Sequence, residues 1–147
     1  TGTFLAILFK LGIGQEYIIL SGFAASFSSK LADTFGSEIG QRWGKRAFLI
    51  TSLRSVPPGT DGAISLAGTV ASLIGSLIMT LCMLILNIIV SIKTFIVVSI
   101  VGFIATLLES FIGAYIQKKF LFMTNEVVNF IQTFIASIIT ILIVYLY

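Results

Sequence analysis

The sequence predicts an all-α fold, a polytopic bundle of four to five transmembrane helices that forms a single domain over residues 1–147. Hydrophobic residues make up 57% of the chain and charged residues only 10%, whereas soluble domains carry about 25% charged residues. The apolar residues also gather in runs of about 20, the length that a helix needs to cross a bilayer. Because lipid offers the backbone no hydrogen-bond partner, these runs should be helices.

Five segments account for the predicted helices. Residues 2–13 are apolar but too short to span a bilayer alone, and residues 17–41 begin apolar and become polar. Residues 63–90, 94–116 and 127–147 each fit a complete span. Because the opening residues look like the end of a membrane segment, we expect further membrane helices to precede them.

Basic residues orient the bundle. Residues 42–61 form a basic loop between the second and third segments, and a lysine pair lies between the last two. Positively charged loops stay on the cytosolic side of a membrane. We therefore expect this loop to face the cytosol of a bacterium or the stroma of a plastid. The loop side carries Arg42, Lys45, Arg46, Arg54, Lys118 and Lys119, and the other side carries Lys10 and Lys93.

Polar or small residues fall on one face of each predicted helix. In the segment 63–90, Gly68, Ser72 and Ser76 are spaced for close contact with another helix. At a rise of about 1.5 Å per residue, the acidic and amide residues reach the depth of the basic loop. We therefore predict a polar site at that depth. Its residues are Asp33, Glu38, Asp61, Glu109, Asn125 and Asn129.

The segment SVPPGTDGAIS (55–65) predicts a stiff turn, since proline fixes φ and glycine permits positive φ. The amides of Gly62, Ala63 and Ile64, at the start of the following helix, would suit a phosphate group. A plain turn followed by a helix N-cap is the alternative.

The candidate site suits Mg²⁺ and phosphate groups. Asp33, Glu38 and Glu109 offer the carboxylates that Mg²⁺ prefers, and a structural network between Lys30 and Glu38 is the alternative. The chain has no histidine, which excludes His-based zinc sites and Ser-His-Asp triads within it. A nucleotide with Mg²⁺ above an apolar bundle indicates phosphoryl transfer to a lipid-like acceptor. The basic side chains that could bind phosphate groups from the aqueous side are Arg42, Lys45, Arg46 and Arg54. A role as positive-inside membrane anchors is the alternative for these residues.

Four motifs follow one another in the order and spacing of one membrane family: LADTFGSEIG (31–40), LITSLRSVPPGTDGAISLAGT (49–69), GFIATLLESFIGAYIQ (102–117) and TNEVVNF (124–130). On these motifs the chain resembles the CTP-dependent phytyl-phosphate kinases of plants and cyanobacteria and their uncharacterised membrane relatives. The resemblance implies transfer of the γ-phosphoryl group of CTP to phytyl monophosphate. The product, phytyl diphosphate, feeds tocopherol synthesis and related prenyl-lipid salvage.

The match has two departures, because Glu109 and Glu126 stand where the family has aspartate. The matched positions are Asp33, Thr34, Ser37, Glu38, Pro57, Gly59, Thr60, Gly62, Ser65, Ser110, Gly113, Gln117, Asn125 and Asn129. We predict that Asp33, Glu38 and Glu109 act in catalysis by holding Mg²⁺. The predicted substrate-binding residues are Arg42, Arg46, Arg54, Gly59, Thr60, Asp61, Gly62, Ser65, Asn125 and Asn129.

Two other functions stay open. A non-catalytic membrane subunit of a larger assembly would keep the same fold, and the two glutamate departures favour it. Such a subunit would bind other membrane proteins and no CTP. A transporter would be expected to show an inverted repeat, and the sequence has no convincing repeat. No nucleic-acid partner is expected for any of these functions.

Overall fold

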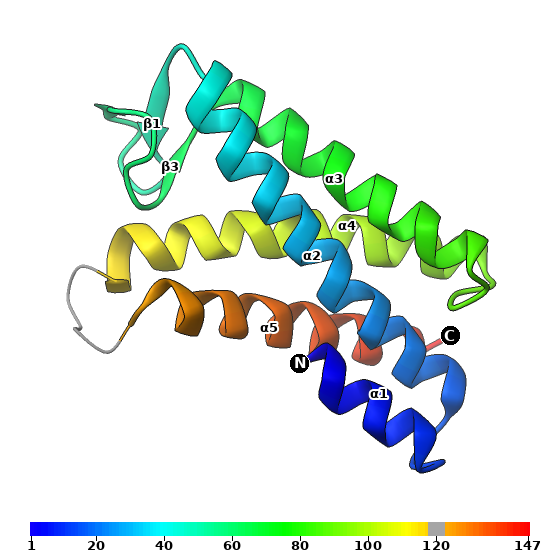
Figure 1. Ribbon diagram of the computed structural model, residues 1–147. Coiled ribbons are helices and arrows are strands. Elements are labelled where there is room, and N and C mark those ends of the chain that lie inside the picture. The colour runs from blue at the N-terminus through cyan, green and yellow to red at the C-terminus, as the bar shows by residue number, and fades with distance from the viewer. Residues whose placement is uncertain (118–122) are drawn as a thin grey trace.

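The computed structural model describes residues 1–117 and 123–147, which form a helical bundle with one small sheet (Figure 1). The elements in chain order are α1 (Gly2–Lys10), α2 (Glu16–Trp43), β1 (Ala47–Leu49), β2 (Ser55–Val56), β3 (Ala63–Ile64), α3 (Leu66–Ile85), α4 (Ile92–Ile112), the π-helical turn η1 (Gly113–Gln117) and α5 (Asn125–Tyr145). The prediction of an α-helical membrane bundle is confirmed. The sheet is an addition inside the predicted loop.

Within the described residues, three helical segments are long and apolar enough to cross a membrane: Leu66–Ile85, Ile92–Ile116 and Asn125–Tyr145. They correspond to the predicted spans 63–90, 94–116 and 127–147. Length and composition therefore support three spans rather than the predicted four to five. Helix α2, with 28 residues, is long enough to cross a membrane, but it is less apolar than these three segments and is not among the candidate spans. Helix α1, with 9 residues, is too short, as predicted.

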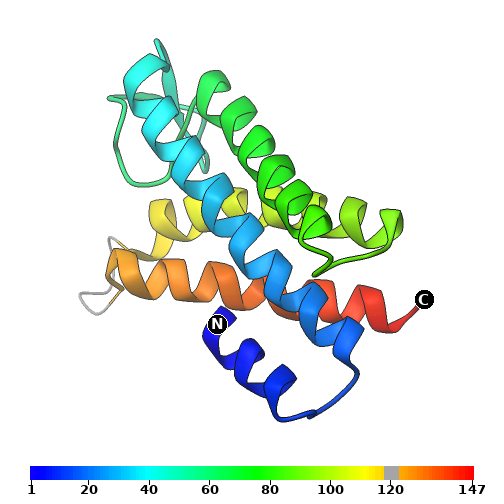
Figure 2. The ribbon, with the colours of Figure 1, turned by 45° about the vertical axis from the view of Figure 1, so that its right-hand side comes forward.

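Helix α2 contacts each of the other four helices. In Figures 1 and 2, α2 and α3 run side by side and cross the α4–α5 pair at an angle. A Cβ atom at Gly36 would lie only 2.1 Å from Ser72 Oγ, and one at Gly40 would lie 3.2 Å from the Gly68 Cα atom. The predicted close-contact face of α3 is confirmed, because these backbones approach to a distance that larger side chains would prevent.

Buried hydroxyl and amide groups link the four long helices, and we call these residues the polar belt. Ser28 Oγ of α2 and Ser76 Oγ of α3 are 2.9 Å apart, and Ser76 Oγ donates to Ser99 O of α4 at 2.6 Å. Gln132 Nε2 of α5 donates to Ser29 O of α2 at 3.0 Å. Because lipid cannot compete for these hydrogen bonds, they fix the relative depth of the helices.

The basic loop folds more tightly than predicted. Strand β1 lies between β2 and β3 in an antiparallel sheet, with Phe48 opposite both Ser55 and Ile64. Gly62 has a φ of +73°, which turns the chain into β3. The helix that was predicted to begin at residue 63 therefore begins at Leu66.

This shift makes one prediction wrong. The Ala63 N–H group donates to Thr60 O at 2.9 Å, so it belongs to a turn and not to the start of a helix. Ser65 is the N-cap of α3, and its Oγ accepts from the Gly68 N–H group at 3.1 Å. The alternative, a turn followed by an N-cap, is correct. The backbone amides of Gly62, Ala63 and Ile64 therefore do not form the predicted phosphate site at the start of a helix.

Candidate functional site

A cavity of about 340 Å³ lies where α2, the loop sheet, α3, α4 and α5 meet. Its volume is in the range of sites for small molecules. The structure brings residues from separate parts of the chain to the lining of this cavity, and their individual roles stay predictions. The predicted site residues that line it are Asp33, Glu38, Gly59, Thr60, Asp61, Gly62, Ser65, Glu109, Asn125 and Asn129.

Helix α2 supplies charged side chains to the cavity. Lys30 and Asp33 are three residues apart, so they lie on one face of the helix. Lys30 Nζ donates to Asp33 Oδ2 at 2.9 Å and to Asn129 Oδ1 of α5 at 2.9 Å. The Asp33 side chain is only 14% exposed, whereas that of Lys30 is 46% exposed. The lysine therefore balances a mostly buried carboxylate and joins α2 to α5.

Glu109 of α4 faces the same cavity. Its carboxyl group is close enough to Asp33, Asp61 and Lys30 to interact electrostatically with all three. Ser110 Oγ is a long, weak donor to Glu109 Oε2 at 3.5 Å. Two negative neighbours and one positive neighbour leave this part of the cavity with excess negative charge, which favours a bound cation.

The turn before β3 carries Asp61 to the cavity. Thr60 Oγ1 closes the turn by donating to Pro57 O at 2.7 Å. A Cβ atom at Gly62 would lie 2.3 Å from the Ala114 Cβ atom in η1, so the turn can rest on the end of α4 only with glycine at this position. The close approach places Asp61 near enough to Glu109 of α4 for the two carboxyl groups to interact electrostatically.

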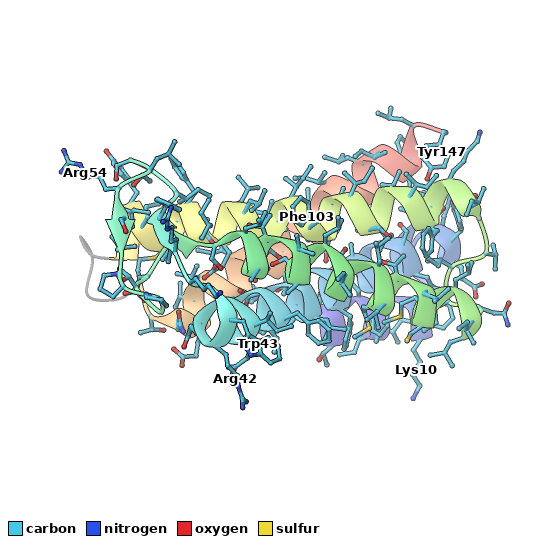
Figure 3. The ribbon with its side chains drawn as sticks, turned by 90° about the horizontal axis from the view of Figure 1, so that it is seen from above. Lys10, Arg42, Trp43, Arg54, Phe103 and Tyr147 are labelled. Carbon is cyan, nitrogen blue, oxygen red and sulfur yellow. The ribbon has the colours of Figure 1, made fainter. Side chains whose placement is uncertain are left out.

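The three arginines that were predicted to bind phosphate do not line the cavity. Arg42, Arg46 and Arg54 are all exposed. The Arg42 guanidinium lies 5.7 Å from the centre of the Trp43 ring, and Figure 3 shows Arg42 and Arg54 extending away from the helices. These arginines therefore add positive charge near this end of the bundle without direct contact to the cavity. The lysines predicted beside them at positions 118 and 119 lie outside the described residues.

Lys30 is the one basic residue of the described chain that lines the cavity, and sequence reasoning did not select it. That reasoning offered only a structural pairing with Glu38, whereas the structure pairs Lys30 with Asp33. The spacing of Lys30 and Asp33 was a usable signal. The contact with Asn129 spans 99 residues of sequence, so no local pattern could have indicated it.

The donor groups of the cavity fit Mg²⁺, although they form no ready-made cage. Among the described residues, no three acidic side chains are grouped closely enough to hold a metal by themselves. Proteins usually hold Mg²⁺ with one or two carboxylates, while water and substrate phosphates complete the shell. Asp33, Glu38 and Glu109 all line the cavity, and their role as ligands of Mg²⁺ stays a prediction.

The fold and the cavity together define an integral membrane protein whose helices enclose a carboxylate-rich polar site near one end. The sequence pattern of the family described as integral membrane protein DUF92 matches residues 1–137. The chain belongs to this family of integral membrane proteins.

Curated relatives support the same assignment. The chain is 45% identical over 137 residues to an uncharacterised membrane protein of Synechocystis sp., covering 93% of this chain and 52% of the relative. It is 39% identical over 141 residues to Protein VTE6, chloroplastic, of Arabidopsis thaliana, covering 95% and 42%. It is 35% identical over 124 residues to an uncharacterised membrane protein of Methanocaldococcus jannaschii, covering 84% and 51%.

The chain thus spans about half the length of the curated relatives it matches. No solved structure is significantly similar to it.

Proposed function

We propose that this chain forms the catalytic part of a membrane kinase that uses CTP to phosphorylate phytyl or another prenyl monophosphate, giving the diphosphate. Three lines of support converge on this proposal: the four motifs, the membership of the family, and relatives from a chloroplast and a cyanobacterium. One observation carries it. A cavity rich in carboxylate and amide groups lies at one end of an apolar bundle.

The charge of the cavity explains why a cation is part of the proposal. Asp33, Glu38, Asp61 and Glu109 line it, and Lys30 is the only basic residue among its described lining. A nucleotide triphosphate is itself strongly negative, so it would be repelled by this wall without divalent cations. Mg²⁺ supplies that neutralisation when it is bound, as in other phosphoryl-transfer enzymes.

The protein groups then act mainly by positioning. The acceptor is already an anionic phosphate, so it needs no strong general base, and the absence of histidine is no obstacle. Alignment of donor and acceptor, together with charge stabilisation, supplies most of the rate in such reactions. Asn125, Asn129 and Ser65 offer polar groups along the cavity wall, and the turn at residues 59–62 offers its backbone.

The exposed arginines are given a different role from the one that the sequence suggested. Arg42, Arg46 and Arg54 lie outside the cavity wall, and they would attract CTP from the aqueous side by long-range electrostatics. The prenyl tail would lie against the apolar helix surfaces. The basic loop would face the stroma of a plastid or the cytosol of a bacterium, as the positive-inside rule suggests.

The direct test uses the complete protein in lipid nanodiscs with radiolabelled CTP, Mg²⁺ and phytyl monophosphate. We expect labelled phytyl diphosphate from the wild type and a loss of at least about 100-fold in turnover for Asp33→Asn. Glu16→Gln is the matched control, because Glu16 is exposed at the opposite end of α2. A folded Asp33→Asn protein with normal turnover would exclude the catalytic role of Asp33.

A non-catalytic membrane subunit is the second candidate. It is favoured by the lack of a ready-made acidic metal cluster among the described residues and by the glutamates that replace aspartate at 109 and 126. Thermal denaturation with CTP and Mg²⁺ separates the two candidates. A kinase should be stabilised by the nucleotide, whereas a subunit without a nucleotide site should not respond.

A further inference from the structure

We propose that Lys30 is an internal counter-ion that exchanges with a divalent cation, and that the displaced ammonium then binds the phosphate brought by that cation. The first half of this inference needs only the cavity and its charges. The second half rests on the proposed function, because it assigns Lys30 to the phosphate of the substrate.

The position of the ammonium group is the starting point. Lys30 Nζ is 2.9 Å from Asp33 Oδ2 and 2.9 Å from Asn129 Oδ1. These oxygens come from two different helices, α2 and α5, and both residues line the cavity. A carboxylate oxygen and an amide oxygen converging on one cation are also the ligands that hard divalent ions select. The ammonium therefore occupies an oxygen-lined position that a divalent cation would need.

Competition follows from the charges. A divalent ion bound by Asp33 would have a unit positive charge within a few ångströms, and such repulsion is strong in a partly buried site. The ion can bind well only if the ammonium moves. Lys30 is 46% exposed and has a flexible four-carbon stem, so it can move without unfolding α2.

A phosphate group that enters the cavity would be the new partner of the displaced ammonium. Lysine carries three donors on a compact charge and binds phosphate well. Among the described residues it is the one basic side chain in the cavity lining. A phosphate group bound to the divalent ion would thus take the place of Asp33 Oδ2 and Asn129 Oδ1 as the partner of Lys30 Nζ. The negative charge of Asp33 would stay balanced by the divalent ion.

A purely structural role for Lys30 predicts the opposite behaviour. If the lysine only ties α2 to α5, its removal should loosen the site and weaken cation binding. If it exchanges with the cation, its removal should strengthen cation binding while it weakens the use of phosphate. The sign of the change in affinity therefore separates the two roles.

The experiment measures Mn²⁺ binding by electron paramagnetic resonance in the complete protein without nucleotide. We expect Lys30→Met to bind Mn²⁺ on the order of tenfold more tightly than the wild type. Lys30→Arg keeps the charge, so its affinity should stay near that of the wild type. Lys10→Met is the matched control, because Lys10 lies on α1 at the far end of the bundle from Arg54 (Figure 3).

The second half is tested with the same variants and the phosphoryl-transfer assay. Lys30→Met should lower turnover by about 100-fold at saturating Mg²⁺, as expected for the loss of a donor to a charged transition state. Thermal denaturation without metal reports whether the Lys30→Met variant is folded. If Lys30→Met does not fold, Lys30→Gln is compared with Lys30→Arg instead.

The outcomes are distinct. Tighter Mn²⁺ binding in the neutral variants supports the exchange even if the wild type transfers no phosphate, in which case the proposed kinase function fails and the counter-ion role stands. Unchanged, weaker or absent Mn²⁺ binding in a folded neutral variant overturns the exchange, whatever the activity. Normal turnover in Lys30→Met overturns the phosphate contact alone.

Discussion

Helices α3 and α2 differ in the polarity of their outward faces. The outward face of α3 is apolar, with exposed Leu73, Leu77 and Leu81, and its small and hydroxyl residues point into the bundle. The second half of α2 instead leaves Lys30 and Glu38 accessible beside the cavity. The less apolar of the two helices is therefore the one that supplies most of the charged side chains of the candidate site.

The two helices also differ in how their buried polar groups are paired. Helix α3 buries Ser72 and Ser76 completely enough that each needs a partner, and each donates to a backbone oxygen. Helix α2 buries serines and also the mostly buried Asp33, whose carboxylate is paired with the exposed Lys30. Hydroxyl groups can be satisfied inside a membrane by neighbouring helices, whereas charged groups at such depth require a partner or a water-filled cavity.

The largest expected effect is on the contact between the two helices. Gly36→Leu should destabilise the bundle by about 3 kcal/mol or more, because its side chain has no room beside Ser72. Unfolding in mixed detergent micelles measures the loss. Val70→Leu, on the exposed face of α3, is the matched control and should be nearly neutral. Equal stability of the two variants would show that α2 and α3 do not approach as closely as described.

An intermediate effect is expected from a lysine placed on each outward face. Leu77→Lys puts a charge near the middle of α3 and should impair membrane integration by about 3 kcal/mol. Thr34→Lys, on the polar half of α2 that lines the acidic cavity, should cost far less. A glycosylation-based insertion assay compares both variants. Similar losses at both positions would remove the distinction between the two faces.

The smallest expected effect concerns the polar belt. Gln132→Leu removes the hydrogen bonds from Gln132 Nε2 to Ser29 O and Thr106 Oγ1. It also removes the buried Oε1 atom, which has no partner among the described groups. We therefore expect a loss of only about 1 kcal/mol. The detergent unfolding assay measures it, with Phe134→Leu on the exposed face of α5 as the control. A loss as large as that of Gly36→Leu would mean that the polar belt contributes as much to stability as the glycine contact does.

The helical bundle and the residues that line the cavity could be predicted from the sequence better than the structure of the loop could. Hydropathy runs located the three apolar spans, and helix rise placed Asp33, Glu109 and Asn129 at one depth. The strands were missed because segments of two or three residues are too short to show a period of two. As a result, the start of α3 was predicted three residues too early.

The arginines show a different limit of sequence reasoning. The excess of basic residues indicates which side of a membrane a loop prefers, but it does not indicate which way a side chain points. Arg42 lies over its neighbour Trp43, and no pattern in the loop distinguishes that contact from one with a ligand. Lys30 was overlooked for the related reason that its second partner lies on another helix.

The close contact between the C-terminal end of α2 and the start of α3 limits which substitutions the sequence can accept there. Gly40, Gly44 and Gly68 all lie against Ser65, since a Cβ atom at any of the three would crowd its hydroxyl group. Gly40, Ser65 and Gly68 also line the cavity, so a side chain added at either glycine would press on Ser65 beside the cavity. Apolar positions on the outer surface of the bundle can therefore vary among similar residues, whereas one methyl group added at Gly40, Gly44 or Gly68 would press on the N-cap of α3.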